Sequence, residues 1–366
     1  MTDSAWRWAA LNLRLAGRPG LRQKLLGREE ENAGRPRALE LALQTLGPAW
    51  QEAAHQEIER ARRFGASILT LEDPGYPPLL RVTSDPPPLL YVWGRLQSED
   101  VLGIAVVGSR RATPYGIQVA RRIAGDLAGQ GFTVVSGLAR GIDAASHCGA
   151  LGAGGRTLAL LGSGLDRIYP AEHQRLAEAI ASQGAVLSEF PFGTPPLKQN
   201  FPERNRVIAG IAWATVVVEA ARDSGSLITA GLAADEGRAV YAVPGPVDEK
   251  NAEGTNGLLR DGALVCRSAG DVIEDLAPQV AEAAGLLARR GPASPAAGPA
   301  QTAGLTPAQR RVLEAIPKTR GIGIDTLGET CGLAPGPLLA TLLDLELLGL
   351  VRQIPGRRFV AAACKI

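Results

Sequence analysis

Cysteine is scarce in this sequence, with four residues among 366. Cys148, Cys266, Cys331 and Cys364 lie far apart, without a CxxC spacing and without a neighbouring pair of histidines. Disulfide frameworks and zinc sites are built from closely spaced cysteines or histidines, so neither is expected here. We therefore expect a protein that has no bound metal and works in the reducing cytoplasm.

Long apolar runs are absent as well. No uncharged stretch approaches the ~20 residues that a membrane-spanning helix needs, and the opening residues MTDSAWRWAA lack the order of a secretory signal. The 39 Lys and Arg residues are nearly balanced by 37 Asp and Glu residues, which gives a formal net charge of +2. Net charge therefore does not predict a nucleic-acid partner, and any such function must depend on local arrangement.

The chain is long enough for two or three domains, and its composition divides it into regions. A content of 45% hydrophobic and 21% charged residues is typical of a globular protein. Residues 1–95 are predicted to form a helical module that ends in a lead-in, where the prolines of residues 77–88 should keep the chain extended. Residues 96–278 form the predicted central domain, residues 279–303 a flexible linker, and residues 304–366 a small C-terminal module.

The central domain is predicted to be a Rossmann-like α/β domain. Its strands are expected in short runs that are apolar throughout, which is typical of strands buried on both faces of a parallel sheet. Helical stretches separate these runs, so we expect a doubly wound, mostly parallel sheet. The predicted strands cover residues 104–108, 132–137, 157–162, 185–190, 215–220, 239–245 and 263–267.

The C-terminal module is predicted to be a winged helix. A short helix is expected around residues 324–331, a longer one around 335–348, and then a two-stranded hairpin that turns at Pro355-Gly356. The longer helix contains Asp344 and Glu346 but no Lys or Arg, whereas a helix in the major groove normally presents cations. A contact with protein or a regulatory role therefore suits this module better than duplex reading. Its apolar stripe, most simply the module's own core, consists of Leu338, Leu339, Leu342 and Leu345.

Loops of small residues follow the predicted strands, and the carboxyl ends of parallel strands form the ligand crevice of such sheets. Gly108, Ser109 and Arg110 suit a phosphate at a helix start, although a tight turn with solvated arginines explains them equally well. The loops 136–140 and 162–164 could likewise present backbone amides to an anion. The sequence contains no GxGxxG and no GxxxxGK[ST], so NAD, P-loop nucleotides and other cofactors are not expected.

Four polar residues near these loops are assigned to structure. Asp143 is expected to cap the helix after the second strand, and His147 to be an ordinary residue of that helix. Glu172 and His173 follow Pro170 at the start of another helix and are also taken as structural.

The segment SEFPFGTPPLKQNFPERNRVIAGIA is the most unusual part of the domain. Lys198 precedes Phe201 by three residues, and Arg204, Asn205 and Arg206 follow closely. Cations that meet phosphates beside an exposed aromatic ring are typical of single-strand binders, in which the ring stacks on a base. In an alternative interpretation, the aromatic ring anchors the loop in the core and the two arginines form ion pairs.

A further segment starts at a strand end with Glu219. That carboxylate could be a catalytic base beside an anion cradle at Ser224-Gly225-Ser226. Equally, one of these serines caps a helix and Glu219 pairs with an arginine.

Six segments in order resemble the bacterial DNA-processing protein A family, also called DprA or Smf. They are VVGSRRATPYG, SGLARGIDAASHCGAL, GSGLDRIYP, FPERNRVIAG, EAARDSGSLITAGLAADEGRAVYAVPG and GTNGLLRDGA, and they cover roughly residues 103–265. The resemblance implies a non-catalytic protein that binds and protects incoming single-stranded DNA and helps to load the RecA recombinase during natural transformation. It also implies a homodimer formed through the Rossmann-like domain, a SAM-like N-terminal module and a winged-helix C-terminal module.

The resemblance assigns DNA contacts to Arg110, Lys198 and Phe201, and the neighbouring loops are interpreted as backbone that faces phosphate. No catalytic residue is expected. The full set predicted to contact DNA is Gly108, Ser109, Arg110, Ser136, Gly137, Arg140, Gly162, Ser163, Gly164, Lys198, Phe201, Arg204 and Asn205.

Two rival functions deserve comparison with this prediction. The first is a nucleotide-processing enzyme that resembles Rossmann-like phosphoribohydrolases, which carry a PGGxGT element beside catalytic Glu and Arg residues. Here the equivalent stretch is EAARDSGSLITA, without the paired glycines and without a following pair of glutamates, which disfavours hydrolysis. The second is a duplex-binding regulator, which the acidic helix of the C-terminal module disfavours.

Overall fold

The computed structural model describes residues 5–26, 42, 47–276, 307–316, 322–332, 338, 341–342, 345, 351–354 and 358–361. The chain divides into two compact units, residues 1–289 and residues 290–366. No helix in the described part of the chain is long and apolar enough to cross a membrane.

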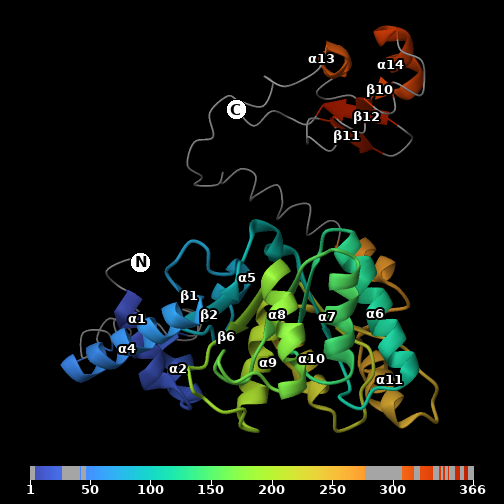
Figure 1. Ribbon diagram of the computed structural model, residues 1–366. Coiled ribbons are helices and arrows are strands. Elements are labelled where there is room, and N and C mark those ends of the chain that lie inside the picture. Colours follow the sequence, from blue (N-terminus) through green and yellow to red (C-terminus); the bar gives the residue numbers. More distant parts are fainter. Residues whose placement is uncertain are drawn as a thin grey trace. The chain divides into compact units, whose positions relative to one another are not determined.

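Nine strands form one sheet in the described part of the first unit (Figure 1), in the order β1-β2-β6-β5-β4-β3-β7-β8-β9. The seven strands from β6 to β9 are parallel, whereas β1 and β2 add an antiparallel edge. The strands are β1 (Ala66–Thr70), β2 (Leu89–Gly94), β3 (Gly103–Val107), β4 (Thr133–Ser136), β5 (Thr157–Leu160), β6 (Ala185–Ser188), β7 (Ala214–Val217), β8 (Ala239–Ala242) and β9 (Leu264–Val265). The chain adds strands on one side of β3 and then returns to its other side with β7, so the doubly wound prediction is confirmed.

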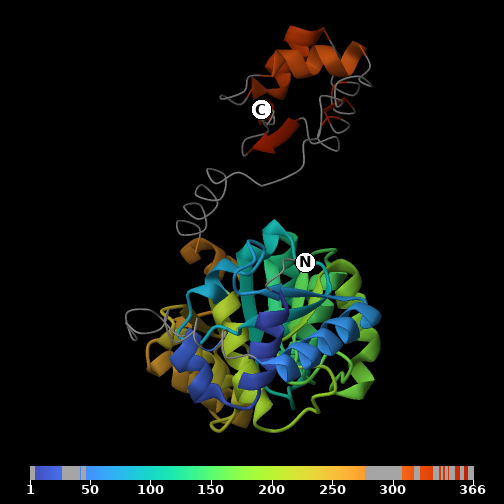
Figure 2. The ribbon, with the colours of Figure 1, turned by 90° about the vertical axis from the view of Figure 1, so that its left-hand side faces the viewer.

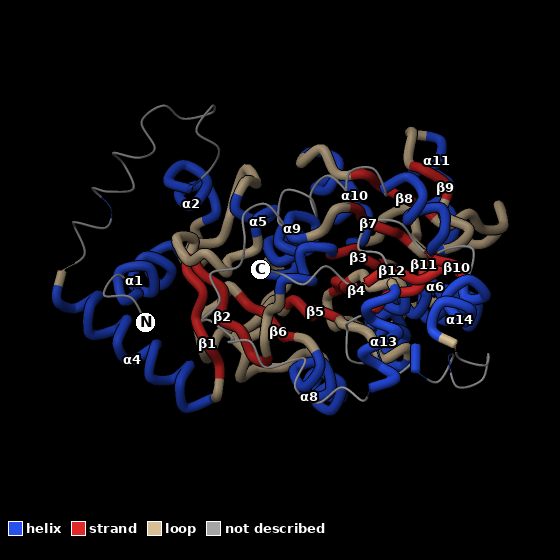
Figure 3. Tube along the Cα trace, turned by 90° about the horizontal axis from the view of Figure 1, so that it is seen from above, coloured by secondary structure: helices blue, strands red, loops and turns tan. Residues whose placement is uncertain are grey.

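Helices cover both faces of this sheet (Figure 3). One face carries α6 (Pro114–Gly129), α7 (Ile142–Gly152) and α8 (Gln174–Gln183). The other face carries α9 (Asn200–Ile211) and α10 (Gly225–Asp235), which pack against each other. Because β3 to β7 are buried on both faces, their residues are mainly apolar, and the few Thr and Ser side chains among them are buried as well. Further helical elements of the central part are η2 (Ser98–Leu102), η3 (Ala171–His173), η4 (Lys250–Ala252) and α11 (Glu253–Arg260), and residues 269–276 are also helical.

The N-terminal helices pack against the antiparallel edge of the sheet and face the viewer in Figure 2. They are α1 (Ala5–Leu15), α2 (Pro19–Leu26) and α4 (Pro48–Phe64). Strands β1 and β2 come from the region predicted as a helical module, yet both belong to the sheet. The expectation of a fully extended lead-in is also wrong at α5 (Pro78–Arg81), a single turn in which Pro78 occupies a first position that needs no amide donor.

The second unit contains α13 (Pro307–Ala315), β10 (Ile322–Gly323), α14 (Ile324–Cys331), β11 (Val351–Ile354) and β12 (Arg358–Ala361). Strands β11 and β12 pair as the predicted antiparallel hairpin. Leu338, Leu342 and Leu345 are buried with Val312 and Phe359, so the stripe does form the unit's own core. The linker 279–303, most of the predicted helix 335–348 and the residues Leu339, Asp344, Glu346, Pro355, Gly356 and Cys364 lie outside the described residues.

Candidate nucleic-acid interface

The predicted contact residues gather at the carboxyl ends of the parallel strands, where the amino end of α9 also lies. Arg110 follows β3, Gly162 follows β5, and Phe201 is the second residue of α9. Parallel strands present their carboxyl ends at one edge of a sheet, which is why Arg110 and Phe201, 91 positions apart, meet there.

Arg110 and Phe201 form the centre of this surface. The guanidinium carbon of the exposed Arg110 lies 4.8 Å from the ring centroid of the half-buried Phe201. A Cβ atom at Gly162 would lie 3.0 Å from the ring, so the glycine lets the ring close onto the loop after β5. This geometry is a cation–π contact on an aromatic ring that keeps part of its surface exposed to solvent.

Tyr169 is a second aromatic residue at this site, and the sequence analysis missed it. Its ring centroid lies 5.7 Å from that of Phe201, with a tilt of 49° between the rings, and the residue is 44% exposed. The sequence feature that could have identified Tyr169 is its position next to Pro170, in the loop that follows β5.

Lys198 and Arg140 are the other exposed cations of the predicted set. Lys198 lies in the segment that leads into α9. The Arg140 Nε atom lies 2.5 Å from Oε1 of Glu172, and this hydrogen bond raises the pKa of Arg140. An ion pair this exposed contributes little to stability, so a phosphate can compete for the guanidinium. Glu172 is thus the partner of a surface cation, in keeping with its assignment to structure.

Arg204 lies beneath the surface, which corrects its prediction as a contact residue. The residue is 4% exposed, and its Nη1 atom donates to the carbonyl oxygens of Gly137, at 2.6 Å, and Leu160. Burial lowers the pKa of Arg204 to about 10. Its guanidinium therefore ties the ends of β4 and β5 together. The alternative interpretation, an ion pair, holds for the neighbouring Arg206, which contacts Asp85 and Glu189.

Asn205 is half-buried beside Arg204 and links two helices. Its Oδ1 atom accepts from Nε of Arg204 at 3.2 Å, and its Nδ2 atom donates to the carbonyl of Gly225 at 3.4 Å. The amide thus connects α9 with the start of α10.

Several backbone amides predicted to face an anion are occupied within the protein. The Gly137 amide donates to Oδ2 of Asp143 at 3.1 Å, and the Gly164 amide donates to the carbonyl of Thr194 at 3.0 Å. The Ser109 amide likewise donates to the Glu219 carbonyl at 2.7 Å. Their acceptors lie within the protein, so this structure does not present these three amides to an anion.

The serines of these loops also point inward. The hydroxyl of Ser136, which is fully buried, donates to the carbonyl of Val106 at 2.6 Å. The hydroxyl of Ser163, which is 1% exposed, donates to the carbonyl of Arg167 at 2.7 Å. Both side chains therefore shape the loops from below and correct the prediction that they contact DNA.

Asp143 and His147 organise the loop after β4. The N-cap of α7 is Gly141 and not Asp143, whose carboxylate instead accepts from the loop amide of Gly137. Burial raises the pKa of Asp143, which Arg204 counteracts. The fully buried His147 accepts from the Leu138 amide at Nε2, so its Nδ1 carries the proton and donates to Thr157 Oγ1 at 2.7 Å. Burial lowers the pKa of His147 to about 3, which keeps the ring neutral.

Glu219 occupies the amino end of α6, at the switch point between β3 and β7. Its Oε2 atom accepts from the Thr113 amide at 2.9 Å, and its Oε1 atom accepts from the Thr113 hydroxyl at 2.5 Å. A Cβ atom at Gly116 would collide with the carboxylate. An internal carboxylate therefore fills the position where Rossmann-like proteins hold a nucleotide phosphate. The expected pairing of Glu219 with an arginine is wrong, whereas Ser224 does cap α10, through the Ser226 amide.

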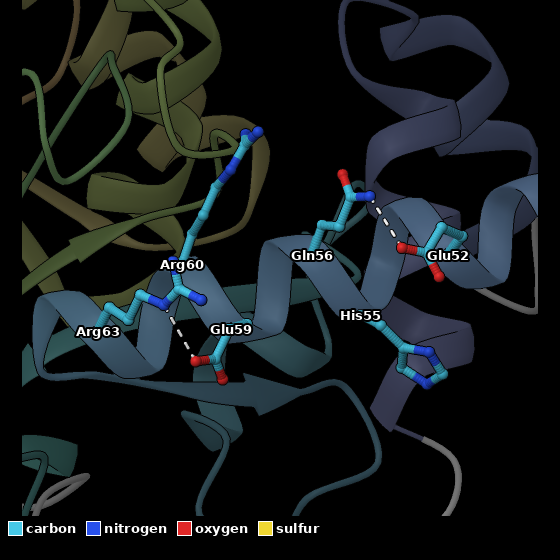
Figure 4. Close-up of a pocket in the computed structure, with 6 residues that line it drawn as sticks. All are labelled: Glu52, His55, Gln56, Glu59, Arg60 and Arg63. Carbon is cyan, nitrogen blue, oxygen red and sulfur yellow. Dashed lines mark hydrogen bonds and ion pairs between the residues drawn. The ribbon is translucent and has the colours of Figure 1, made fainter.

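A shallow hollow lies elsewhere, along the exposed side of α4 (Figure 4). The side chains along it pair with each other, as in the contact of 3.1 Å between Arg63 and Glu59 and that of 2.9 Å between Gln56 and Glu52. Its lining consists of Glu52, His55, Gln56, Glu59, Arg60 and Arg63. Within the described part of the chain, no three His, Cys, Asp or Glu side chains gather to hold a metal ion.

Comparison with known proteins agrees with this arrangement of strands and loops. A family model for the DNA recombination-mediator protein A matches residues 67–277, and a model for the DprA winged helix domain matches residues 294–357. The chain belongs to the DprA family. Protein Smf of Escherichia coli K12 is 38% identical over 333 residues, which are 86% of this chain and 86% of that protein. Protein Smf of Synechocystis is 38% identical over 328 residues, which are 83% of this chain and 82% of that protein.

Two solved structures of DprA proteins share the fold. The X-ray structure of DprA from Streptococcus pneumoniae covers 73% of this chain and 97% of its own, with 33% identity and a TM-score of 0.60. DprA from Helicobacter pylori, described for its single-stranded DNA binding mode, covers 58% of this chain and 97% of its own, with 31% identity and a TM-score of 0.52. The predicted family, the Rossmann-like sheet and the winged-helix module are thereby confirmed.

Proposed function

We propose that this protein binds single-stranded DNA, without sequence preference and without catalysis, on the surface formed by Arg110, Phe201 and Tyr169. The observation that carries the proposal is the cation held 4.8 Å from the centroid of a half-exposed aromatic ring at the strand ends. Such a pair offers one group to a phosphate and one to a base. The single-stranded DNA binding mode described for the Helicobacter pylori relative supports single-stranded DNA as the ligand.

In the proposed complex, Arg110, Lys198 and Arg140 meet phosphates, and Phe201 stacks on a base. Gly108 and Gly162 allow the close packing that shapes this surface, because a Cβ atom at Gly108 would meet the side chain of Ile142 and one at Gly162 the ring of Phe201. Arg204 and Asn205 act beneath this surface and hold its loops. Stacking on an aromatic ring tolerates any base, which suits a protein that handles DNA of unknown sequence.

The internal carboxylate of Glu219 supports a binding role over nucleotide hydrolysis. It fills the anion position at the amino end of α6, where a nucleoside monophosphate would need to place its phosphate. Incubation with AMP should therefore release no adenine. Release of adenine in proportion to enzyme concentration would favour the phosphoribohydrolase alternative.

The family resemblance extends the proposal to partners. We propose a homodimer formed through the central domain, delivery of the bound strand to RecA during natural transformation, and a cytoplasmic location. Exposed apolar residues on β9, where Leu264 is 45% and Val265 48% exposed, support a partner at this edge of the sheet. Sedimentation should give a dimer at tens of micromolar, and a purely monomeric chain would contradict this part of the proposal.

Two alanine variants test the surface directly. Lys198→Ala and Arg110→Ala should each weaken binding to labelled oligo-dT and reduce the slope of log K against log salt by about 0.7 for each lost phosphate contact. Arg121→Ala, which removes an exposed cation from α6, is the matched control and should bind like the wild type. If Lys198→Ala and Arg110→Ala also bind like the wild type at 50 and 200 mM salt, the assignment of the surface is wrong.

A further inference from the structure

Polar contacts from the N-terminal helices converge on residues 189–193, the start of the segment that joins β6 to α9. Asn12 of α1 donates from Nδ2 to the carbonyl of Glu189 at 2.9 Å. The Phe192 amide donates to Oε1 of Glu57 of α4 at 2.7 Å. Asn12, Glu57 and Glu189 are each at most 6% exposed, so water does not readily replace these bonds.

The Glu189 carboxylate links α2 to α9. It lies 3.4 Å from Nη1 of Arg22 on α2, and it forms an ion pair with Arg206 on α9. Asp85 joins the same two arginines, at 2.8 Å from Arg22 and 3.1 Å from Arg206. The loss of one partner from such a buried cluster leaves an uncompensated charge, so the cluster fixes the positions of both helices.

Apolar contacts also connect the N-terminal helices with residues 189–193 and with α9. Phe192 is 8% exposed, and its ring makes edge contacts with Phe64 of α4 and Tyr91 of β2, each with a centroid distance of 5.4 Å. Trp8 and Leu11 of α1 lie in one core cluster with Ile208 of α9. The N-terminal helices therefore determine where residues 189–193 and the body of α9 lie.

The far end of the same segment is the proposed DNA surface. Lys198 lies in it, and α9 begins at Asn200, directly before Phe201. The Asn200 side chain donates to the carbonyl of Gly162 at 3.0 Å, which holds this end against the loop after β5. The segment is thus fixed by the N-terminal helices at one end and by the strand-end loops at the other.

We infer that the N-terminal helices set the affinity for single-stranded DNA indirectly, by fixing the segment 189–199 that places Lys198 and Phe201. Glu57 and Asn12 are positioning residues in this arrangement. The inference rests on the proposed function, and it assigns to α1, α2 and α4 a role that needs no DNA contact of their own.

Three variants of the full-length chain test it. Glu57→Ala removes the acceptor of the Phe192 amide, whereas Glu57→Gln keeps an acceptor oxygen and should retain wild-type affinity. Ser84→Ala is the control, because it removes a partly buried hydroxyl contact of 2.5 Å to Glu236 that lies outside the segment. Each variant is titrated with labelled oligo-dT in a salt series, and its melting temperature is recorded.

Glu57→Ala should weaken binding to oligo-dT by roughly fivefold or more. Fivefold is about the smallest effect that is typical of energetic coupling between two distant sites. In a Lys198→Ala background, the same change should weaken binding by a smaller factor than in the wild type, because one of the two groups that the segment places is already absent. Ser84→Ala should lower the melting temperature without a comparable change in affinity. If Glu57→Ala does not fold, Asn12→Ala, which removes only one hydrogen bond, replaces it in the same comparison.

Two outcomes overturn the inference. One is wild-type affinity of folded Glu57→Ala together with weakened binding by Lys198→Ala, which leaves the proposed function intact. The other is full additivity of the Glu57→Ala and Lys198→Ala effects. Absence of oligo-dT binding by the wild-type protein would instead overturn the proposed function, and this inference with it.

Discussion

The guanidinium carbon of Arg110 lies 4.8 Å from the centroid of the Phe201 ring. The two residues come from different crossovers of the sheet, the loop after β3 and the amino end of α9. In the proposed complex, their contact places a group for phosphate beside a group for a base before any DNA arrives.

Phe201→Ala should weaken binding to oligo-dT by roughly 5- to 150-fold, because the loss of a base–aromatic stack costs about 1–3 kcal/mol. The salt dependence should stay unchanged, since no phosphate contact is lost. Titrations of wild type and variant at two salt concentrations measure both quantities. A lower melting temperature with unaltered affinity for each folded molecule would instead assign the ring to the core.

Tyr169→Ala should also weaken binding to oligo-dT, by less than Phe201→Ala, because Tyr169 flanks the ring that lies under Arg110. Tyr169→Phe keeps the aromatic face and should bind within about twofold of the wild type. Fluorescence anisotropy of labelled oligo-dT distinguishes the two variants. Equal affinity of both variants would remove Tyr169 from the surface.

His147 should make stability depend on pH below about 6.5. Its pKa is about 3 in the folded protein, against 6.5 for an ordinary histidine, so only the unfolded chain takes up a proton as pH falls through that range. The free energy of unfolding therefore falls by about 1.4 kcal/mol for each pH unit below 6.5. At pH 5 it should be about 2 kcal/mol lower than at pH 8.

His147→Gln lacks the titrating ring and is the natural comparison. The stability advantage of the wild type over this variant should shrink by about 2 kcal/mol between pH 8 and pH 5, as measured by denaturant unfolding. An advantage of equal size at both pH values would show that the ring does not titrate as its burial predicts.

The strands of the central sheet could be predicted because burial on both faces leaves a mainly apolar run instead of an alternating one. The meeting of Arg110 and Phe201 at one edge of the sheet could be predicted for a related reason. Parallel strands end at a common edge, so residues far apart in sequence meet there without any knowledge of side-chain packing.

The buried position of the Arg204 side chain could not be predicted in this way. An arginine in the run ERNR is ordinarily solvated, and its actual partners are the carbonyls of Gly137 and Leu160, 67 and 44 residues earlier in the chain. Bonds to backbone leave no pattern of complementary charge in the sequence. The inward amides of the 137–139 loop escaped prediction for the same reason, because their acceptors on α7 depend on how that helix packs.

The C-terminal unit should be dispensable for binding single strands. It forms a compact unit with its own core, and the proposed DNA surface lies wholly in the first unit. A chain that ends at residue 278 should therefore keep most of its affinity for oligo-dT in the same anisotropy titration. Loss of binding by a folded, truncated chain would place part of the DNA site in the winged-helix module.

The most direct test of the whole account is a titration of labelled oligo-dT and of a duplex of equal length with the full chain, across a salt series. The account predicts tighter binding of oligo-dT at every salt concentration, because only unpaired bases can stack on Phe201. It also predicts that log K falls linearly with log salt, by about 0.7 for each phosphate contact. Equal or tighter binding of the duplex would contradict a single-strand surface at Arg110 and Phe201.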